Sequence, residues 1–414
     1  MADYGLLGRF TRREFGRVVS AAGLCMAVSP GFGEKEPKGS PAVSVRGADS
    51  LRAHAASSGL LVGCAVVPEL LDFPTASAQF STDPYTWTVA EQANILVPEN
   101  ALKWSSLRPS PTEYSFTQAD KLFAFAARHQ QKVRGHNLCW HEQLPSWFAA
   151  TATKANAQEL LKQHIQTVAG RYSGRVHSWD VVNEAIFAKD GRADGLRKSP
   201  WLDLLGPGYI EMAFVAAAKA DPMAKLTYND YDIELDTPEQ AEKRGLVLLM
   251  LRRLKARGIP IHAMGIQSHL QANGPQPGAG IVSFVREVAK LGLEVYITEL
   301  DVNSHTLPGG PELQAEAVAA VYHDYLTLVL QEPNAKAVLT WGISDAHSWL
   351  NQSKQPWALR ADGARQRPMP FDEQYAPSPA FFAMRNVLNS LRRTGPSLGG
   401  SIPASIKTPN SSAQ

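Results

Sequence analysis

Short apolar runs recur along the chain and alternate with longer amphipathic segments. The runs are rich in Val, Ile, Leu, Tyr and Trp, which is typical of buried strands. Eight such runs are found, at residues 60–67, 94–100, 132–140, 176–184, 225–231, 263–270, 294–302 and 337–345. Helical spacing is found between them, for example in residues 153–172 and 237–258. The second of these segments has Thr237 placed as an N-cap, Pro238 at the first helical position and Gly258 just past the end.

Eight strands that alternate with helices over roughly 340 residues predict an α/β fold, a (β/α)8 TIM barrel in one large domain. A doubly wound open sheet is the alternative. It usually carries a glycine-rich phosphate loop after an early strand, and the sequence has neither G-x-G-x-x-G nor a Walker motif. The barrel is therefore the favoured fold.

Polar and ionisable residues stand at the ends of seven of the runs. In a barrel, the carboxyl ends of the strands carry the catalytic groups. These residues are Glu99 and Asn100, His136, Asn183 and Glu184, Asn229 and Asp230, Gln267 and His269, Glu299 and Asp301, and Asp345. Because all of them follow strands on the same side of the predicted barrel, they indicate a functional face.

The composition is typical of a globular protein with a large core and does not indicate a nucleic-acid-binding or disulfide-rich protein. The 414 residues are 44% hydrophobic, enough for a large core, and 41 Lys and Arg against 39 Asp and Glu give a net charge of +2. The near-neutral charge and the absence of basic blocks do not indicate a nucleic-acid partner. Three cysteines do not form a disulfide framework. Cys64 and Cys139 lie in apolar runs and are expected to be free buried thiols, although a disulfide between them stays open.

The N-terminus resembles an export signal. Arg12 and Arg13 precede an uncharged apolar run at residues 18–28, which is too short for a bilayer span of about 20 residues. Paired arginines before such a run are typical of the twin-arginine type, so residues 1–30 are interpreted as this signal. No clean A-x-A site marks its cleavage point. The expected location is the periplasm or the external medium, with no membrane contact in the mature form.

The remaining chain divides by composition. Residues 31–50 are rich in Gly, Pro and Ser and are interpreted as a linker. Residues 394–414 have a similar composition and are predicted to be a disordered tail. A single catalytic domain is therefore expected over residues 51–393.

Two carboxylates in the set at the strand ends suggest a reaction. Glu184 ends the fourth run and Glu299 ends the seventh, so the barrel would place them across its mouth from each other. A single Glu at a strand end is most often a surface ion pair, but a facing pair is what glycoside hydrolysis requires. His269 and Asp301 would orient Glu299 and favour its anion, whereas the apolar residues before Glu184 favour its protonated form. Asn183 would donate to a sugar hydroxyl.

Other hydrolytic chemistries have less support. The stretch "HEQLP" begins at His141 like a zinc-binding H-E-x-x-H motif, but Pro145 occupies the place of the second histidine. His136, His141 and His269 have no spacing that supports a metal site, so no metal and no other cofactor is predicted. The G-x-S-x-G elbow of acyl-transfer enzymes is absent.

Seven motifs in order carry a family resemblance. They are "VPENALKW", "GHNLCWH", "WDVVNEA", "YNDY", "IQSHL", "ITELDV" and "TWGISDAHSWL". With these motifs the sequence resembles glycoside hydrolase family 10, the retaining endo-β-1,4-xylanases, over roughly residues 55–392. The (β/α)8 barrel is that family's fold.

The resemblance implies a role for each matching residue. Glu184 would be the general acid/base and Glu299 the nucleophile of a mechanism with a covalent glycosyl-enzyme. Asp301 would stand behind His269, which contacts the nucleophile. The implied substrate-binding residues are Glu99, Asn100, Lys103, His136, Trp140, Asn183, Tyr231, Gln267, His269, Trp341 and Trp349. Of these, the first three would bind sugars on the non-reducing side of the cut, and the last two would be aromatic walls.

The resemblance also implies the partners, xylan and xylo-oligosaccharides, and a monomer is expected. The two tryptophan walls would crowd the place where glucose carries its hydroxymethyl group, which xylose lacks. Departures from the family pattern are Cys139 in place of an aliphatic residue and Ser378 in place of a lysine. A β-1,4-glucanase or cellulase on a related barrel is the alternative enzyme. A sugar-binding protein without turnover is the alternative outside enzymes, but it would have lost one of the two carboxylates.

Overall fold

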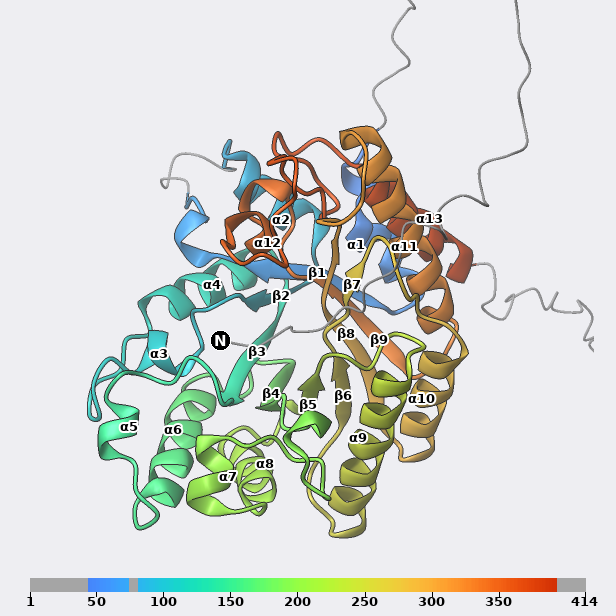
Figure 1. Cartoon of the computed structure of the whole chain (residues 1–414). Helices are drawn as coiled ribbons and strands as arrows, with labels where there is room; N and C mark the ends of the chain where they lie inside the picture. The colour runs from blue at the N-terminus through green and yellow to red at the C-terminus, as the bar shows by residue number, and fades with distance from the viewer. Residues whose placement is uncertain (1–43, 74–80, 393–414) are drawn as a thin grey trace, which may run out of the picture.

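The computed structural model describes residues 44–73 and 81–392 (Figure 1). The strands in this part of the chain are β1 (Leu61–Val66), β2 (Ile95–Pro98), β3 (Lys132–Cys139), β4 (Ser178–Asn183), β5 (Lys225–Asp230), β6 (Ala263–Ile266), β7 (His269–Gln271), β8 (Glu294–Asn303) and β9 (Ala335–Thr340). The α-helices are α1 (Leu51–Ala56), α2 (Pro84–Gln92), α3 (Trp104–Leu107), α4 (Thr117–Arg128), α5 (Phe148–Thr151), α6 (Ala157–Arg171), α7 (Pro200–Leu205), α8 (Tyr209–Ala220), α9 (Pro238–Ala256), α10 (Ala279–Lys290), α11 (Pro311–Leu330), α12 (Trp349–Gln352) and α13 (Pro379–Arg392). Short 3-10 helices are η1 (Gly47–Asp49), η2 (Pro68–Leu70), η3 (Ala188–Asp190) and η4 (Asp345–His347).

Parallel strands close into a barrel. The order around it is β1, β2, β3, β4, β5, β6, β8 and β9, and β9 pairs back onto β1. Helices surround these strands on the outside, as Figure 1 shows. The predicted (β/α)8 barrel is thus confirmed, and the open doubly wound sheet is not the fold.

Two predicted strands were clearly wrong in extent: the run at residues 337–345 is a strand only as far as Thr340, so that Asp345 lies in η4, and the run at residues 263–270 is interrupted. The run at residues 263–270 is not continuous, because the backbone of Ser268 adopts a left-handed conformation with φ of +65°. The Ser268 N–H leaves the ladder and donates to Glu234 Oε1 at 2.9 Å. The chain therefore forms β6 in the barrel wall and then β7, which pairs with the outer half of β8. Because of this break, Gln267 directly follows β6, and His269 is the first residue of β7.

The helix predicted from its capping residues is confirmed. The Thr237 side chain accepts a hydrogen bond from the N–H of Gln240 at 3.3 Å, Pro238 begins α9, and Gly258 follows its end with φ of +68°. A side-chain acceptor at the N-cap satisfies one of the free N–H groups of the first turn. Glycine adopts the left-handed conformation after the last turn without a Cβ penalty.

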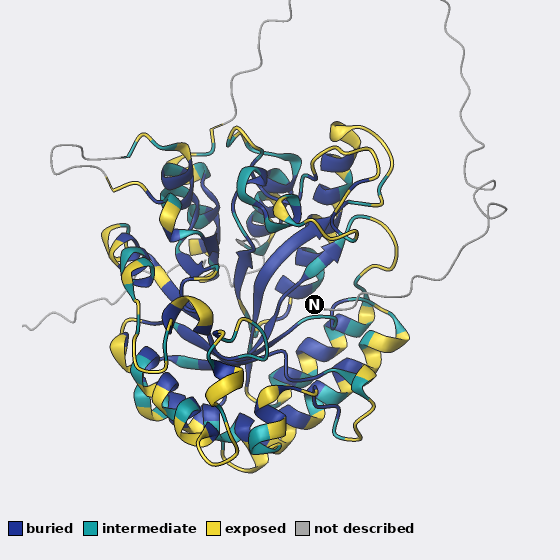
Figure 2. Ribbon diagram, turned by 60° about the vertical axis from the view of Figure 1, so that its left-hand side comes forward, coloured by how far each residue is buried: buried dark blue, intermediate teal, exposed yellow. Residues whose placement is uncertain are grey.

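Two layers of apolar packing stabilise the barrel. The larger cluster lies between the strands and the helices, and it includes alternate positions of β1 such as Val62 and Cys64. A smaller cluster uses the other strand positions, among them Ala65, Val97 and Leu339, and it fills the barrel interior. Figure 2 shows this arrangement as buried strands inside helices whose outer faces are exposed.

The two cysteines of the barrel are both buried and free, as predicted. Cys64 lies in β1 and Cys139 ends β3. Burial raises the pKa of the Cys64 thiol to about 12. These side chains therefore act as small apolar groups in the packing.

The predicted flanking segments fall mostly outside the described residues. This holds for the export signal at 1–30, for most of the linker at 31–50 and for the tail at 394–414. Residues 44–50 include η1, and the carbonyl oxygen of Val45 accepts a hydrogen bond from Gln92 Nε2 at 2.7 Å. Across residues 44–73 and 81–392, no helix combines the length and the apolar character needed to cross a membrane.

Candidate active site

Glu184 stands immediately after β4, where the backbone turns. Its φ is +57°, and its N–H donates to the carbonyl oxygen of Asn229 at 2.9 Å. Arg197 Nε donates to the carbonyl oxygen of Glu184 at 2.8 Å. A positive φ is uncommon for a residue other than glycine and marks a site that its surroundings hold in place. The local backbone thus fixes the direction of the Glu184 carboxyl group.

Glu299 lies within β8 and is 5% exposed. Asn229 Nδ2 donates to Glu299 Oε1 at 2.7 Å and also to Asn183 Oδ1 at 2.8 Å. Thr298 Oγ1 donates to Asn229 Oδ1 at 2.7 Å, which fixes the orientation of the amide. One amide therefore connects the end of β4 to the carboxylate on β8.

A second amide completes this connection. Gln267 Nε2 donates to Glu184 Oε1 at 2.9 Å, and Asn183 Nδ2 donates to the same oxygen at 2.9 Å. The backbone also contributes, since the N–H of Glu299 donates to the carbonyl oxygen of Gln267 at 3.0 Å. These bonds join the two glutamates across the mouth of the barrel, as the sequence predicted.

The surroundings of Glu299 favour its anion. His269 Nε2 lies 3.4 Å from Glu299 Oε2, and His269 Nδ1 lies 2.9 Å from Asp301 Oδ1. Burial alone would raise the pKa of Glu299, but the hydrogen bond from His269, the nearby His136 and the Asn229 amide together lower it to about 2. Burial opposes the charge on His269 as well, yet the carboxylates of Asp301 and Glu299 raise its pKa well above the ordinary value.

Glu184 has a different environment. Both hydrogen bonds to its carboxyl group come from neutral amides and reach the same oxygen, Oε1. Within residues 44–73 and 81–392, no Lys, Arg or His forms an ion pair with it. One carboxyl group is thus held as an anion by a charged partner, and the other is held only by amides. The structure therefore distinguishes the two carboxyl groups by their partners, and the ion pair suits Glu299 to remain ionised.

A hollow of about 680 Å³ is lined by both carboxyl groups. Its lining residues are Lys103, His136, Trp140, Glu142, Gln143, Asn183, Glu184, Tyr231, Gln267, His269, Glu299, Trp341, Trp349, Gln355 and Trp357. Trp349 Nε1 donates to Asp301 Oδ2 at 2.6 Å, so this wall is tied to the same group that orients His269. We call this hollow the central cleft. It brings together every predicted site residue except Glu99, Asn100 and the supporting Asp301.

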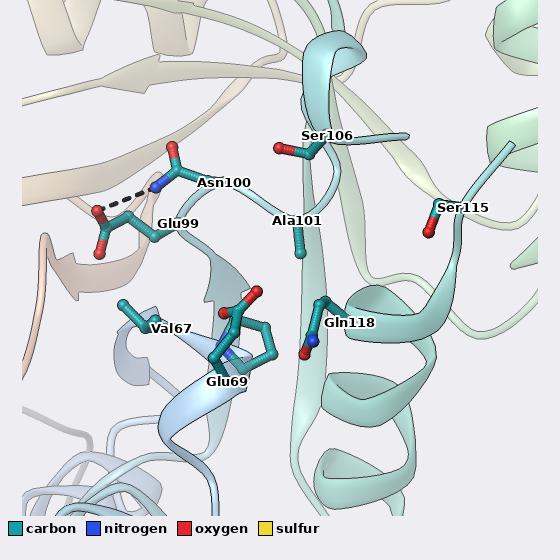
Figure 3. Close-up of a pocket in the computed structure, with 9 residues that line it drawn as sticks. Val67, Glu69, Glu99, Asn100, Ala101, Ser106, Ser115 and Gln118 are labelled. Atoms are coloured by element: carbon teal, nitrogen blue, oxygen red, sulfur yellow. Dashed lines mark hydrogen bonds between the residues drawn. The ribbon is translucent and has the colours of Figure 1, made fainter. Parts of the chain in front are cut away.

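Glu99 and Asn100 lie beside the central cleft and are joined to it by Lys103. Lys103 Nζ donates to Asn100 Oδ1 at 2.9 Å, and Asn100 Nδ2 donates to Glu99 Oε1 at 3.2 Å (Figure 3). The same ammonium group lies 5.2 Å from the ring centroid of Trp140 and 5.6 Å from that of Trp341. The cluster therefore lies next to two aromatic rings that line the cleft.

Buried charged residues bind two further predicted side chains of the cleft, His136 and Tyr231. His136 Nδ1 lies 2.9 Å from Asp180 Oδ2, and Asp180 also pairs with Arg134 inside the barrel. The hydroxyl of Tyr231 accepts a hydrogen bond from Arg197 at 2.7 Å. Because these partners are buried, the polar groups lining the cleft have fixed orientations.

Four cleft residues were missed by sequence reasoning. Glu142 and Gln143 belong to the "HEQLP" stretch, which was considered only for metal binding. Gln355 and Trp357 come from the irregular segment after α12, and the ring centroid of Trp357 lies 5.2 Å from that of Trp349. The signal in the sequence was Trp357 itself, an aromatic residue shortly after "HSWL", which extends the aromatic wall formed by Trp349. Among the described residues, no group of three or more His, Cys, Asp or Glu side chains could hold a metal ion.

Comparisons with known proteins agree with this geometry. The family model described as glycosyl hydrolase family 10 matches residues 50–387. A β-1,4-xylanase of Dictyoglomus thermophilum is 38% identical, covering 70% of this chain and 80% of its own length. An endo-1,4-β-xylanase B of Thermotoga neapolitana is 35% identical over 74% of this chain and 84% of its own.

Solved structures show the same likeness. The crystal structure of xylanase 10B from Thermotoga maritima has a TM-score of 0.73 at 34% identity, covering 83% of this chain and 99% of that one. Xylanase 10B from Thermotoga petrophila, solved in complex with xylobiose, has the same TM-score and identity and covers 83% of this chain and 98% of its own. The fold, the site and these matches together establish that the chain belongs to glycosyl hydrolase family 10.

Proposed function

We propose that this glycoside hydrolase is a retaining endo-β-1,4-xylanase that cuts internal bonds of xylan through a covalent glycosyl-enzyme. The observation that carries the proposal is the pair of carboxyl groups on β8 and after β4, which amide side chains bridge and of which only Glu299 has a histidine partner. Relatives that are named xylanases, and a similar structure that holds xylobiose, support xylan as the substrate.

In the first step, Glu299 attacks the anomeric carbon of the sugar. Its anionic state is favoured by His269 and Asn229, so the nucleophile is available over most of the pH range. Glu184 donates its proton to the glycosidic oxygen as the bond to the leaving chain breaks. The products of this step are a glycosyl ester on Glu299 and a released sugar chain with a free hydroxyl.

In the second step, Glu184 acts in the opposite sense. As a carboxylate, it removes a proton from a water molecule that attacks the anomeric carbon, and Glu299 leaves as the restored anion. Two inversions at the same carbon give net retention. A carboxyl separation of roughly 5–5.5 Å accompanies this mechanism in other retaining enzymes.

The side chains of the cleft suit a pyranose substrate. Apolar sugar faces pack on indole rings, here those of Trp140, Trp341 and Trp349, while amides and charged groups bind the hydroxyl rim. Asn183 and Lys103 are placed for the second task. We expect Trp341 and Trp349 to crowd the place where glucose carries its hydroxymethyl group, so that xylan is preferred over cellulose. Export by the twin-arginine-type signal, to the periplasm or the medium, is part of the same proposal.

The deciding experiment is proton NMR of a xylo-oligosaccharide digest, followed from the first minutes, with a cello-oligosaccharide in parallel. We expect the β-anomer to appear first, and only from the xylose oligomer. Early α-anomer would mean inversion and would exclude Glu299 as the nucleophile. Cleavage of the glucose oligomer alone would indicate a β-1,4-glucanase, and no turnover of either would indicate a sugar-binding protein.

A further inference from the structure

Ser268, at the break between β6 and β7, lies between two residues that contact the catalytic carboxyl groups. Gln267 donates to Glu184 Oε1, and His269 pairs with Glu299. The backbone of Ser268 is left-handed, with φ of +65°. A positive φ is uncommon for serine and persists only where the surroundings hold the backbone. The conformation of this one residue therefore sets where the Gln267 amide and the His269 ring stand relative to each other.

The carboxyl group of Glu234 holds the Ser268 backbone. Its Oε1 atom accepts the N–H of Ser268 at 2.9 Å, and its Oε2 atom accepts the N–H of Ile233 at 2.8 Å. Glu234 is 2% exposed and Ser268 is fully buried, so a lost acceptor would leave a desolvated N–H group. Glu234 is not found among the described residues that line the central cleft. Any effect of Glu234 on the reaction is therefore transmitted through Ser268.

The segment that carries Glu234 is fixed by the outer layer of helices. Arg244 on α9 donates through Nη1 to the carbonyl oxygens of the residues on either side of Glu234, at 3.1 and 2.7 Å. Tyr325 on α11 supports the break itself, since its hydroxyl oxygen lies 2.7 Å from Ser268 Oγ. Two helices thus hold the anchor and the break in place before any substrate is bound.

The backbone at the break is also connected to the strand of the nucleophile. The N–H of Asp301 donates to the carbonyl oxygen of Ser268 at 3.4 Å, and the N–H of Glu299 donates to that of Gln267 at 3.0 Å. A displacement of about 1 Å at catalytic groups can cost roughly a hundredfold in rate. A shift of Ser268 would therefore reach both catalytic carboxyl groups.

This anchor requires a carboxyl group. Burial and the nearby Asp232 raise the pKa of Glu234 to about 7, and the N–H groups of Ser268 and Ile233 act in the opposite direction. An amide has only one acceptor oxygen. A glutamine at this position could therefore accept one of the two N–H groups, and its own NH₂ group would face the other.

We propose that Glu234 is a positioning residue of the reaction. Acting through Ser268, it holds the Gln267 amide against the acid/base and the His269 ring against the nucleophile. The inference rests on the proposed function, since it uses the roles given there to the two carboxyl groups.

The test compares Glu234→Gln with the matched control Asp221→Asn. Asp221 is also a fully buried carboxyl group, and its oxygens accept the N–H of Gly174 at 3.0 Å and Nε1–H of Trp179 at 3.1 Å. It lies between α8 and the start of β5, at the end of the barrel opposite the cleft. Each substitution replaces a carboxyl group by an amide of the same size, but only the first is connected to the active site.

The measured quantities are kcat and KM for an aryl β-xylobioside between about pH 2.5 and pH 7, with urea unfolding at each pH to give the folded fraction. We expect Glu234→Gln to lower kcat about tenfold and to keep KM within about twofold, because the substrate's own contacts remain. The acid limb of kcat/KM should move upward by about half to one pH unit, since the contact between His269 and Glu299 weakens. Asp221→Asn should lose stability but keep the wild-type kcat and acid limb.

Three results would overturn the proposal. These are a wild-type kcat in Glu234→Gln, an equal loss of kcat in the control, and a lower kcat with an unmoved acid limb, because His269 would then have kept its place. Glu234→Asp withdraws the carboxyl group by one methylene and serves if the amide prevents folding. The same two changes, a lower kcat and a raised acid limb, are expected in it.

A second background tests the route through Ser268. Glycine adopts a positive φ without strain, so Ser268→Gly should depend less on the anchor. Glu234→Gln should therefore lower kcat by no more than about threefold in the Ser268→Gly background. Equal factors in the two backgrounds would refute this route. A wild-type enzyme that does not hydrolyse the xylobioside would refute the proposed function as well, whereas an active wild type with an unaffected Glu234→Gln refutes the positioning role alone.

Discussion

The interaction between His269 and Glu299 makes the acid limb of the pH profile a direct test of the site. The pKa of Glu299 falls from 4.5 to about 2, because the hydrogen bond from His269 and the charges of the histidines overcome the effect of burial. This difference corresponds to about 3 kcal/mol in favour of the anion. The substitution that probes it is His269→Gln, which keeps a hydrogen-bond donor but removes the charge.

The sign of the effect follows from linkage. A carboxyl group whose pKa is lower in the folded protein stabilises the fold above its unfolded value, near 4.5, and this contribution disappears as the pH falls toward 2. A hydrogen bond to a charged group contributes about 1.5–3 kcal/mol. Loss of the charge should therefore move the acid limb of kcat/KM upward by about one to two pH units.

The assay is kcat/KM for an aryl xylobioside between about pH 2.5 and pH 7, together with urea unfolding at the same pH values. The variant should lose activity at a higher pH than the wild type. It should also lack part of the stability that the wild type has above pH 4.5 and loses as the pH falls toward 2. The control is His323→Gln, which changes an exposed histidine on α11 that pairs with Asp324. An acid limb that does not move in His269→Gln would refute the account of the Glu299 anion given above.

Three further predictions concern other parts of the site and the core. Glu299→Ala with added azide should yield an α-glycosyl azide, and Glu184→Ala with an activated substrate should yield the β-azide, so exchanged products in chromatography and NMR would reverse the two roles. In Gly265→Ala the new Cβ would overlap Asn229 Oδ1, and since that amide holds Glu299, kcat should fall at least tenfold with a smaller change in KM. Because burial raises the pKa of Cys64 to about 12, this thiol and Cys139 should not react with a thiol reagent until the protein is unfolded, and rapid labelling of either of these two positions in the native protein, located by peptide mass spectrometry, would contradict this.

The parts of the fold that sequence could predict are those with regular patterns. Strand periodicity and helix caps gave the barrel, and polar residues after the strands gave the catalytic face. The break at Ser268 was not predictable, because its cause is a hydrogen bond to Glu234, which lies 34 positions earlier in the chain. A local pattern of residues cannot show a partner that only the folded chain brings near.

In the site, too, residues that belong to a regular pattern or a motif could be predicted, and residues whose role depends on folded contacts could not. Glu184 was predicted because it ends a strand-like run, and Glu299 because it lies among the polar residues of another, although the structure places it within β8 and not at its end. Lys103 and the tryptophans matched family motifs. Gln355 and Trp357 were missed, since the segment that carries them has no periodicity and no family motif. The role of Asn229 as a bridge was also hidden, although it was noted as a polar strand end. Its function depends on which side chains face it across three strands.

Because of the bridging amides, the stereochemical outcome of the reaction and the choice of polysaccharide depend on different parts of the chain. The distance between the carboxyl groups depends on side chains from β4, β5, β6 and β8, which are consecutive in the barrel wall. The outer aromatic wall, with Trp349 and Trp357, depends instead on the chain that follows β9. Natural variation or loop exchange after β9 can therefore change which polysaccharides enter the cleft, while the stereochemical outcome stays under the control of the barrel.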